Sequence, residues 1–173
     1  MSTNSDIDDA GNDLRVWVAT AGDLLASRNT LAKGRSEAEE IGKKQSMPRP
    51  VLPEERSYWI EVMLVGFAVE NLLKALWIVR GNALYRNGKL VKIGVKKSHD
   101  LVSIANRVGF PVTDPERNEL SMLSEIMIGV GRYPMAPRPE EQGFTESWGS
   151  TSDSIMQKLV QRLKITIRNE EPS

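Results

Sequence analysis

The apolar residues of this chain are densest between Pro53 and Gly81, in the stretch PEERSYWIEVMLVGFAVENLLKALWIVRG. Its proline suits the first turn of a helix, where the missing N–H would have no partner, and the glutamates after it suit the positive end of the helix dipole. The apolar positions surround the helix axis instead of forming one stripe, which is typical of a helix buried among others or of a membrane span. The sequence therefore predicts one long central helix.

Three polar residues, Glu70, Asn71 and Lys74, interrupt the second half of this helix. The uninterrupted apolar run ends at Glu70, whereas a membrane span needs about 20 apolar residues, so we expect other helices around it and no membrane. Glu70 and Lys74 are one helical turn apart with the acid first, the favourable orientation for an ion pair. They form either a partly buried ion pair at the edge of the core or one wall of a polar pocket, in which Glu70 orders a partner such as His99.

Periodic apolar positions predict helices in four further segments. The second of these has Ser98 as its expected N-cap and Asp100 in its first turn, and it stops at Gly109. The predicted helices cover residues 13–33, residues 101–108, a segment from the Thr113–Glu116 capping box to about Gly131, and a last helix from about 151.

The segments between these helices have loop composition. Residues 34–50 contain almost nothing apolar, so we expect a long mobile connection with at most a frayed helical turn at 37–41. Residues 133–149 hold three prolines and two glycines and are expected to form an irregular surface loop. Within it, Trp148 either folds back on the helices or anchors a partner.

A short hairpin interrupts the helical pattern at residues 83–94. Asn87-Gly88 lies between two short runs that are partly β-branched, which is the strongest local hairpin signal. The fold class is therefore all-α, a bundle of four or five helices with a small inserted β-hairpin. We expect one domain over residues 13–170, preceded by a disordered acidic tail at 1–12.

Composition removes several function classes. The chain has 173 residues, no cysteine and one histidine. It therefore has no disulfide framework, no cysteine catalysis and no thiolate metal site, and a histidine-based zinc site is improbable. We expect no metal and no cofactor. No apolar segment near the start resembles a secretion signal, so the expected compartment is the cytoplasm.

The net charge is zero, but the charges are unevenly distributed. Residues 1–13 carry acids and no base, and residues 80–97 carry bases and no acid. A solvated loop explains the basic segment, and so does a contact with an anion or a nucleic acid. The candidate nucleic-acid-binding residues are Arg86, Lys89, Lys92, Lys96 and Lys97.

Three motifs in order carry a family resemblance. VENLLKAL on the central helix is followed by SHDLVSIANRVG and then by MIGVGRYPMAPRP. This order resembles the HEPN family of prokaryotic all-α domains, over about Tyr58 to Pro139 plus the last helix. The resemblance implies a helical bundle, often a homodimer, in toxin–antitoxin, phage-defence, stress or RNA-processing systems. Some members of the family are thought to bind nucleotides or to serve a nucleotidyltransferase partner.

The chain departs from the ribonuclease members of that family, which place a histidine a few residues after an arginine and cleave RNA without metal. If Arg132 matches that arginine, the corresponding later positions hold Pro137, Arg138 and Pro139. The only histidine, His99, matches the HDL landmark instead. Arginine stays protonated and cannot act as a base, so metal-free cleavage would need another group that titrates near neutrality, such as His99.

The candidate ligand-binding residues are Glu70, Lys74, His99, Arg132 and Tyr133. His99 either makes a structural bond beside the helix start or binds a phosphate or a base. Arg132 either bonds the last carbonyls of a helix or holds a phosphate, with Tyr133 stacking on a base.

The expected function is that of a non-catalytic HEPN-like protein that binds RNA, a nucleotide or a partner protein such as an antitoxin or a nucleotidyltransferase. One alternative is a divergent metal-independent ribonuclease that uses Arg132 and His99. Another is a pure interaction module whose basic hairpin binds an acidic protein. We expect a homodimer, because the bundle leaves apolar helix surface uncovered.

Overall fold

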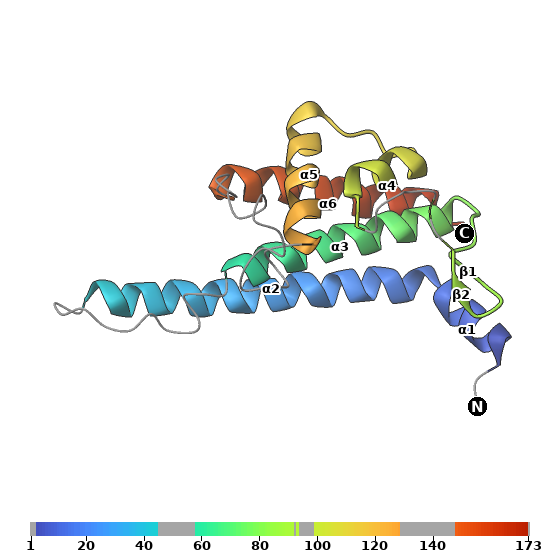
Figure 1. The fold of residues 1–173 in the computed structure, drawn as a ribbon, viewed down its shortest axis with the longest axis horizontal. Helices are drawn as coiled ribbons and strands as arrows, with labels where there is room; N and C mark the ends of the chain where they lie inside the picture. The colour runs from blue at the N-terminus through green and yellow to red at the C-terminus, as the bar shows by residue number, and fades with distance from the viewer. Residues whose placement is uncertain (1–2, 45–57, 92, 94–98, 129–147, 173) are drawn as a thin grey trace.

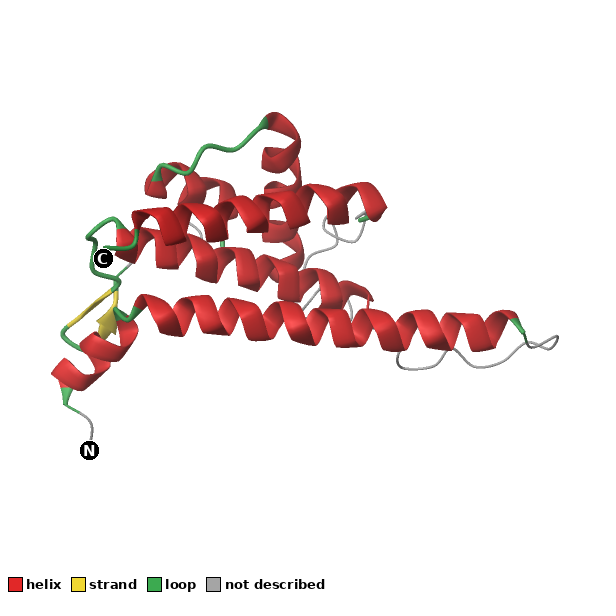
Figure 2. Cartoon of the chain, turned by 180° about the vertical axis from the view of Figure 1, so that it is seen from behind, coloured by secondary structure: helices red, strands yellow, loops and turns green. Residues whose placement is uncertain are grey.

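The computed structural model of the protein describes residues 3–44, 58–91, 93, 99–128 and 148–172. Within these ranges it consists of helices, one small two-stranded sheet and the loops that connect them, which confirms the predicted all-α fold with an inserted hairpin (Figures 1 and 2). The elements are α1 (Asn4–Gly11), α2 (Leu14–Lys43), α3 (Tyr58–Val79), β1 (Tyr85–Arg86), β2 (Lys89–Leu90), α4 (Leu101–Val108), α5 (Asp114–Ile128) and α6 (Ser150–Glu170).

The central helix of the fold is α3. It packs against α2 on one side and against α4, α5 and α6 on the other, so that it lies between α2 and the other three helices (Figure 1). Eleven of its 22 residues are buried, as the all-round apolar pattern predicts. At Gly66 the backbone of α3 closely approaches α5, because a Cβ atom there would lie 2.5 Å from Met127 Sδ.

By length and composition, α3 is also long and apolar enough to cross a membrane, and it is the one such helix among the residues described. Of the window that meets this test, 56% is buried inside the fold. A buried core helix meets the same test, and the packing of α3 against four other helices matches that description.

The prediction that residues 34–50 form a mobile connection is wrong as far as residue 43, because α2 continues as helix to Lys43. The apolar period fades after residue 33, and ion pairs take its place. Arg35 binds Glu39 within α2 at 2.8 Å and binds Glu61 of α3 at 2.8 Å. Glu61 is 2% exposed, so this ion pair fixes the second half of α2 to the start of α3. Residues 45–50 lie outside the described ranges.

Part of the expected disordered tail is also ordered, because residues 4–11 form α1. Thr3 and Asp6 make a reciprocal capping box at its start. No residue of α1 is buried, and its contacts with the hairpin include the hydrogen bonds that Asp8 accepts from the turn and the packing of Gly11 against the Tyr85 ring. The sequence pattern missed α1 because it has no apolar stripe.

The hairpin has the expected turn. Tyr85 pairs with Leu90 and Arg86 with Lys89, so the two-residue turn is Asn87-Gly88. Both turn residues have positive φ, 53° and 73°, as the turn type that suits a hairpin requires.

The helix ends agree with the sequence in part. Asp100 caps α4 by accepting a hydrogen bond from the Ser103 N–H, so the predicted N-cap at Ser98 is wrong. Ser98 itself lies outside the described residues. Gly109 ends α4 with φ 77°. The expected end of α5 near Gly131 and most of the loop 133–149 also lie outside the described ranges.

Candidate functional site

A buried carboxylate on α3 contacts both a lysine and the histidine of this chain. Glu70 is 6% exposed, and each of its oxygens is engaged. Oε1 lies 2.7 Å from Lys74 Nζ, and Oε2 lies 2.7 Å from His99 Nδ1. Glu70 and Lys74 come from successive turns of α3, and His99 lies just before α4. The structure shows both the predicted ion pair and the predicted contact with His99, whereas the polar pocket around them stays a prediction. We call these three residues the Glu70 cluster.

The backbone of His99 is unusual. Its φ of 67° lies in the left-handed region, which a residue with a Cβ atom seldom adopts. The ring meets Phe67 edge-on, with the ring centroids 5.6 Å apart and an interplanar angle of 84°. Such a conformation persists only where surrounding contacts hold it, and it is more frequent at functional sites. Glu70 and Phe67, both on α3, supply two of those contacts.

The electrostatics of the Glu70 cluster favour an ionised carboxylate. Burial raises the pKa of Glu70, but the charge of Lys74 and the hydrogen bonds from Lys74 and His99 outweigh burial and bring the pKa below its ordinary value. Glu70 is thus an anion at neutral pH, and its negative charge balances the positive charge of Lys74.

A cavity of about 480 Å³ lies next to this cluster, and Lys74 contacts one of the side chains that line it. Lys74 Nζ lies 4.9 Å from the centroid of the Trp17 ring, and Trp17 lines the cavity. Tyr85 of the hairpin lines it as well, and so does Asn71, the residue after Glu70. Residues of α1 line it too. Two aromatic rings and an amide are side chains that can stack on a nucleobase and hydrogen-bond to it.

The basic hairpin presents two of its predicted cations. Arg86 and Lys89 are opposite each other in the register, and both are exposed. The turn between them is already engaged by an anion of this chain. The Asp8 carboxylate accepts hydrogen bonds from the backbone N–H groups of Asn87 and Gly88, at 2.7 Å and 2.8 Å. The structure therefore places an acidic helix on the basic hairpin.

Five predicted site residues lie outside the described residues and are not placed by the structure. They are Lys92, Lys96, Lys97, Arg132 and Tyr133. The proposed pairing of Arg132 with His99 is therefore untested.

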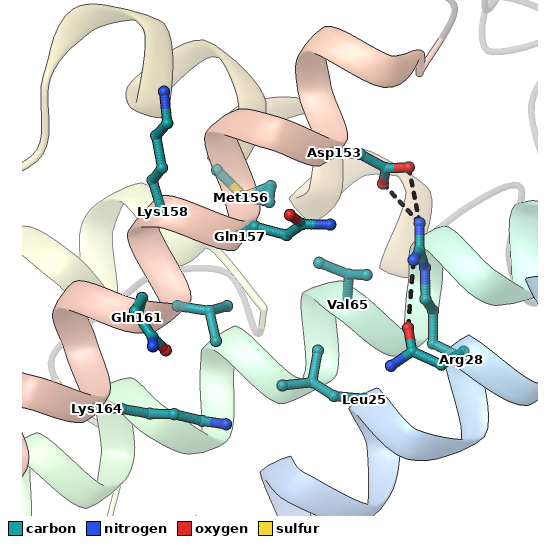
Figure 3. A pocket seen from close by; sticks show the side chains of 11 residues that line it. Leu25, Arg28, Val65, Asp153, Met156, Gln157, Lys158, Gln161 and Lys164 are labelled. Atoms are coloured by element: carbon teal, nitrogen blue, oxygen red, sulfur yellow. Dashed lines mark hydrogen bonds and ion pairs between the residues drawn. The ribbon is translucent and has the colours of Figure 1, made fainter.

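Sequence reasoning missed a second cavity, of about 550 Å³, between α2, α3 and α6. Its apolar wall includes Leu25 and Val65, while Lys164 extends along it and Lys158 points away (Figure 3). Arg28 of α2 closes one end by binding both oxygens of Asp153 at 2.7 Å.

A hydrogen-bond network around the buried Trp148 supports that end of the second cavity. Trp148, 4% exposed, donates from Nε1 to Asp153 Oδ1, and its carbonyl accepts a hydrogen bond from Tyr58. Trp148 thus folds back on the bundle, which is one of its two predicted roles. No sequence signal connects Arg28 with Asp153, because they are 125 positions apart.

Among the residues described, no group of three or more His, Cys, Asp or Glu side chains is placed to hold a metal ion. Comparison of the chain with protein-family models, curated proteins and solved structures found no match. The resemblance to the HEPN family therefore remains a prediction from the three motifs.

Proposed function

We propose that this protein binds RNA or a nucleotide at the Glu70 cluster and the adjoining cavity, and that it does not cleave its ligand. The observation that supports this most is that one buried carboxylate holds Lys74 and His99 beside a cavity that Trp17 and Tyr85 help to line. Lys74 and His99 supply N–H donors for a phosphate group. Trp17 and Tyr85 supply ring faces for a base, and such stacking contributes about 1–3 kcal/mol per base.

The basic hairpin extends the proposal from a nucleotide to a longer RNA. Arg86 and Lys89 are exposed on the same hairpin that contributes Tyr85 to the cavity. Phosphates beyond the first nucleotide would contact these side chains, and the affinity for RNA would then fall steeply with salt concentration.

The chemistry of the chain favours binding over cleavage. Metal-independent cleavage of RNA needs a base and an acid, both with pKa values near neutrality. The chain has one histidine and no cysteine. Both Glu70 oxygens are engaged, one with Lys74 and one with His99, so we assign Glu70 an orienting role. The order of the three motifs supports a biological setting for this binding. In it, the chain is a cytoplasmic HEPN-like protein of a prokaryotic defence or stress system and works as a homodimer or with a partner protein.

Titrations with AMP and with a short fluorescein-labelled RNA test the proposal. We expect saturable binding of both ligands, and steeper salt dependence for the RNA. His99→Gln and Lys74→Gln should each weaken binding about tenfold, since a hydrogen bond to a charged group contributes about 1.5–3 kcal/mol. Lys158→Gln is the control, because this exposed lysine lies on α6. Absence of binding, or an equal effect of all three substitutions, would contradict the proposal.

A second candidate function is a divergent metal-independent ribonuclease. It is favoured by the Glu70–His99 contact, because a carboxylate on one ring nitrogen also orients a histidine that acts as a base. Incubation of the RNA with the protein and a chelator distinguishes the two functions. Intact RNA supports the binding protein, and cleavage that His99→Gln abolishes supports the ribonuclease.

A further inference from the structure

The hairpin turn presents two backbone N–H donors toward the same oxygen-bearing group. Asn87 and Gly88 both have positive φ, and their N–H groups point at the two carboxylate oxygens of Asp8. Successive N–H groups with this convergence form a concavity that binds anions. The flanking side chains, Arg86 and Lys89, are cationic and exposed. The turn therefore has the donors and the charge of a phosphate site, and in this structure a carboxylate occupies it.

The element that brings the carboxylate also touches the hairpin at its two ends, where Asn4 lies against Gly88 and Gly11 packs against the Tyr85 ring. None of the residues of α1 is buried, so undocking α1 exposes no core. The C-terminal end of α1 has its own anchor. The Asn12 side chain accepts hydrogen bonds from the N–H groups of Leu84 and Tyr85 and donates one to the Tyr85 carbonyl. Asn12 can keep the chain attached to β1 while Asp8 leaves the turn.

The position of α1 also affects the adjoining cavity. Asp6, Ile7, Ala10 and Gly11 line the same cavity as Trp17 and Tyr85. The helix carries Asp6, Asp8 and Asp9 and no base. A docked α1 therefore places negative charge at the turn, where an RNA would bring a phosphate, and along the wall of the cavity that would take a base.

We propose that the hairpin turn is a phosphate-binding site and that Asp8 is its resident, exchangeable ligand, which an RNA phosphate displaces. This inference rests on the proposed function, because it makes α1 a competitor of RNA. An intramolecular competitor acts at an effective concentration in the millimolar range for a short tether, so removing it raises the affinity for RNA without adding a contact.

The full-length variants Asp8→Asn and Asp9→Asn form the test. Both remove one negative charge from the same helix, but Asp9 is exposed and only Asp8 binds the turn. We expect Asp8→Asn to bind the short RNA about tenfold more tightly than the wild type. Asp9→Asn should change the affinity less than about twofold, since exposed charges are strongly screened by salt. Equal effects of the two substitutions, or weaker binding by Asp8→Asn, would overturn the proposal.

A second readout separates this proposal from the proposed function. Pyrophosphate, which has no base for the cavity, is titrated into ¹⁵N-labelled protein while the Asn87 and Gly88 amide signals are followed. These signals should shift in Asp8→Asn at concentrations that leave the wild type and Asp9→Asn unchanged, even if AMP does not bind. Unmoved amide signals in Asp8→Asn would overturn the phosphate site. So would loss of the hairpin signals in that variant, because Asp8 would then be a structural brace.

Discussion

The substitution Glu70→Gln probes the residue that organises the proposed site. It keeps the size of the side chain and removes its charge. Glu70 is 6% exposed, and the side chain of Lys74 is 16% exposed, so the ammonium group loses its counter-ion in a largely dry environment. His99 loses a carboxylate partner at the same time.

The size of the effect follows from this burial. Removing one partner of a fully buried ion pair costs about 3–5 kcal/mol, whereas exposed pairs contribute about 0–1 kcal/mol. Because Lys74 and His99 are partly exposed and glutamine can still accept a hydrogen bond, we expect a loss of roughly 2–3 kcal/mol in the free energy of unfolding at neutral pH. For a chain of this size, that loss lowers the melting temperature by about 4–12 °C.

Urea unfolding of the wild type and of Glu70→Gln at several pH values measures this effect. The pKa of Glu70 is lowered in the folded protein, so its stabilising contribution is full above the ordinary glutamate pKa and is lost as the pH falls through the folded pKa. The difference between the two proteins should therefore be largest near neutrality and should shrink below about pH 4. A difference under about 0.5 kcal/mol at neutral pH would refute the account of a buried, charge-organised cluster.

Three further substitutions test the packing. Arg35→Met removes the arginine that binds the Glu61 carboxylate, and it should destabilise the protein by about 3 kcal/mol in urea unfolding. No change in stability would mean that this ion pair does not fix the second half of α2 to α3. Gly66→Ala places a Cβ atom against Met127 and should lower the free energy of unfolding by about 1 kcal/mol in the same assay. A gain in stability would contradict the close approach of α3 and α5. Gly88→Ala strains a φ of 73° by about 1–2 kcal/mol and should speed hydrogen exchange in the hairpin; unchanged exchange would contradict the turn.

The sequence predicts those parts of the fold that local chemistry determines. The central helix follows from its apolar run, the hairpin turn from Asn87-Gly88, and the start of α5 from its Thr113–Glu116 capping box, which the structure confirms. The partners of Glu70 were predictable in part, because Lys74 is one helical turn away.

The parts that sequence reasoning misses depend on contacts between distant positions. The second half of α2 is fixed by Arg35 binding Glu61 on another helix. Helix α1 is held by Asp8 binding a turn 79 positions later, and neither contact leaves an apolar pattern in the sequence. The second cavity likewise depends on Arg28 meeting Asp153.

The central claim is that the Glu70 cluster binds RNA or a nucleotide and leaves it intact. The chain has a single histidine, so its imidazole NMR signals belong to His99 without further assignment. Adding the short RNA should shift these signals in a saturable way, with the midpoint at the dissociation constant from the fluorescence titration, and the recovered RNA should be full length. Imidazole signals that stay unchanged while RNA binds, or RNA that is recovered cleaved, would contradict the claim.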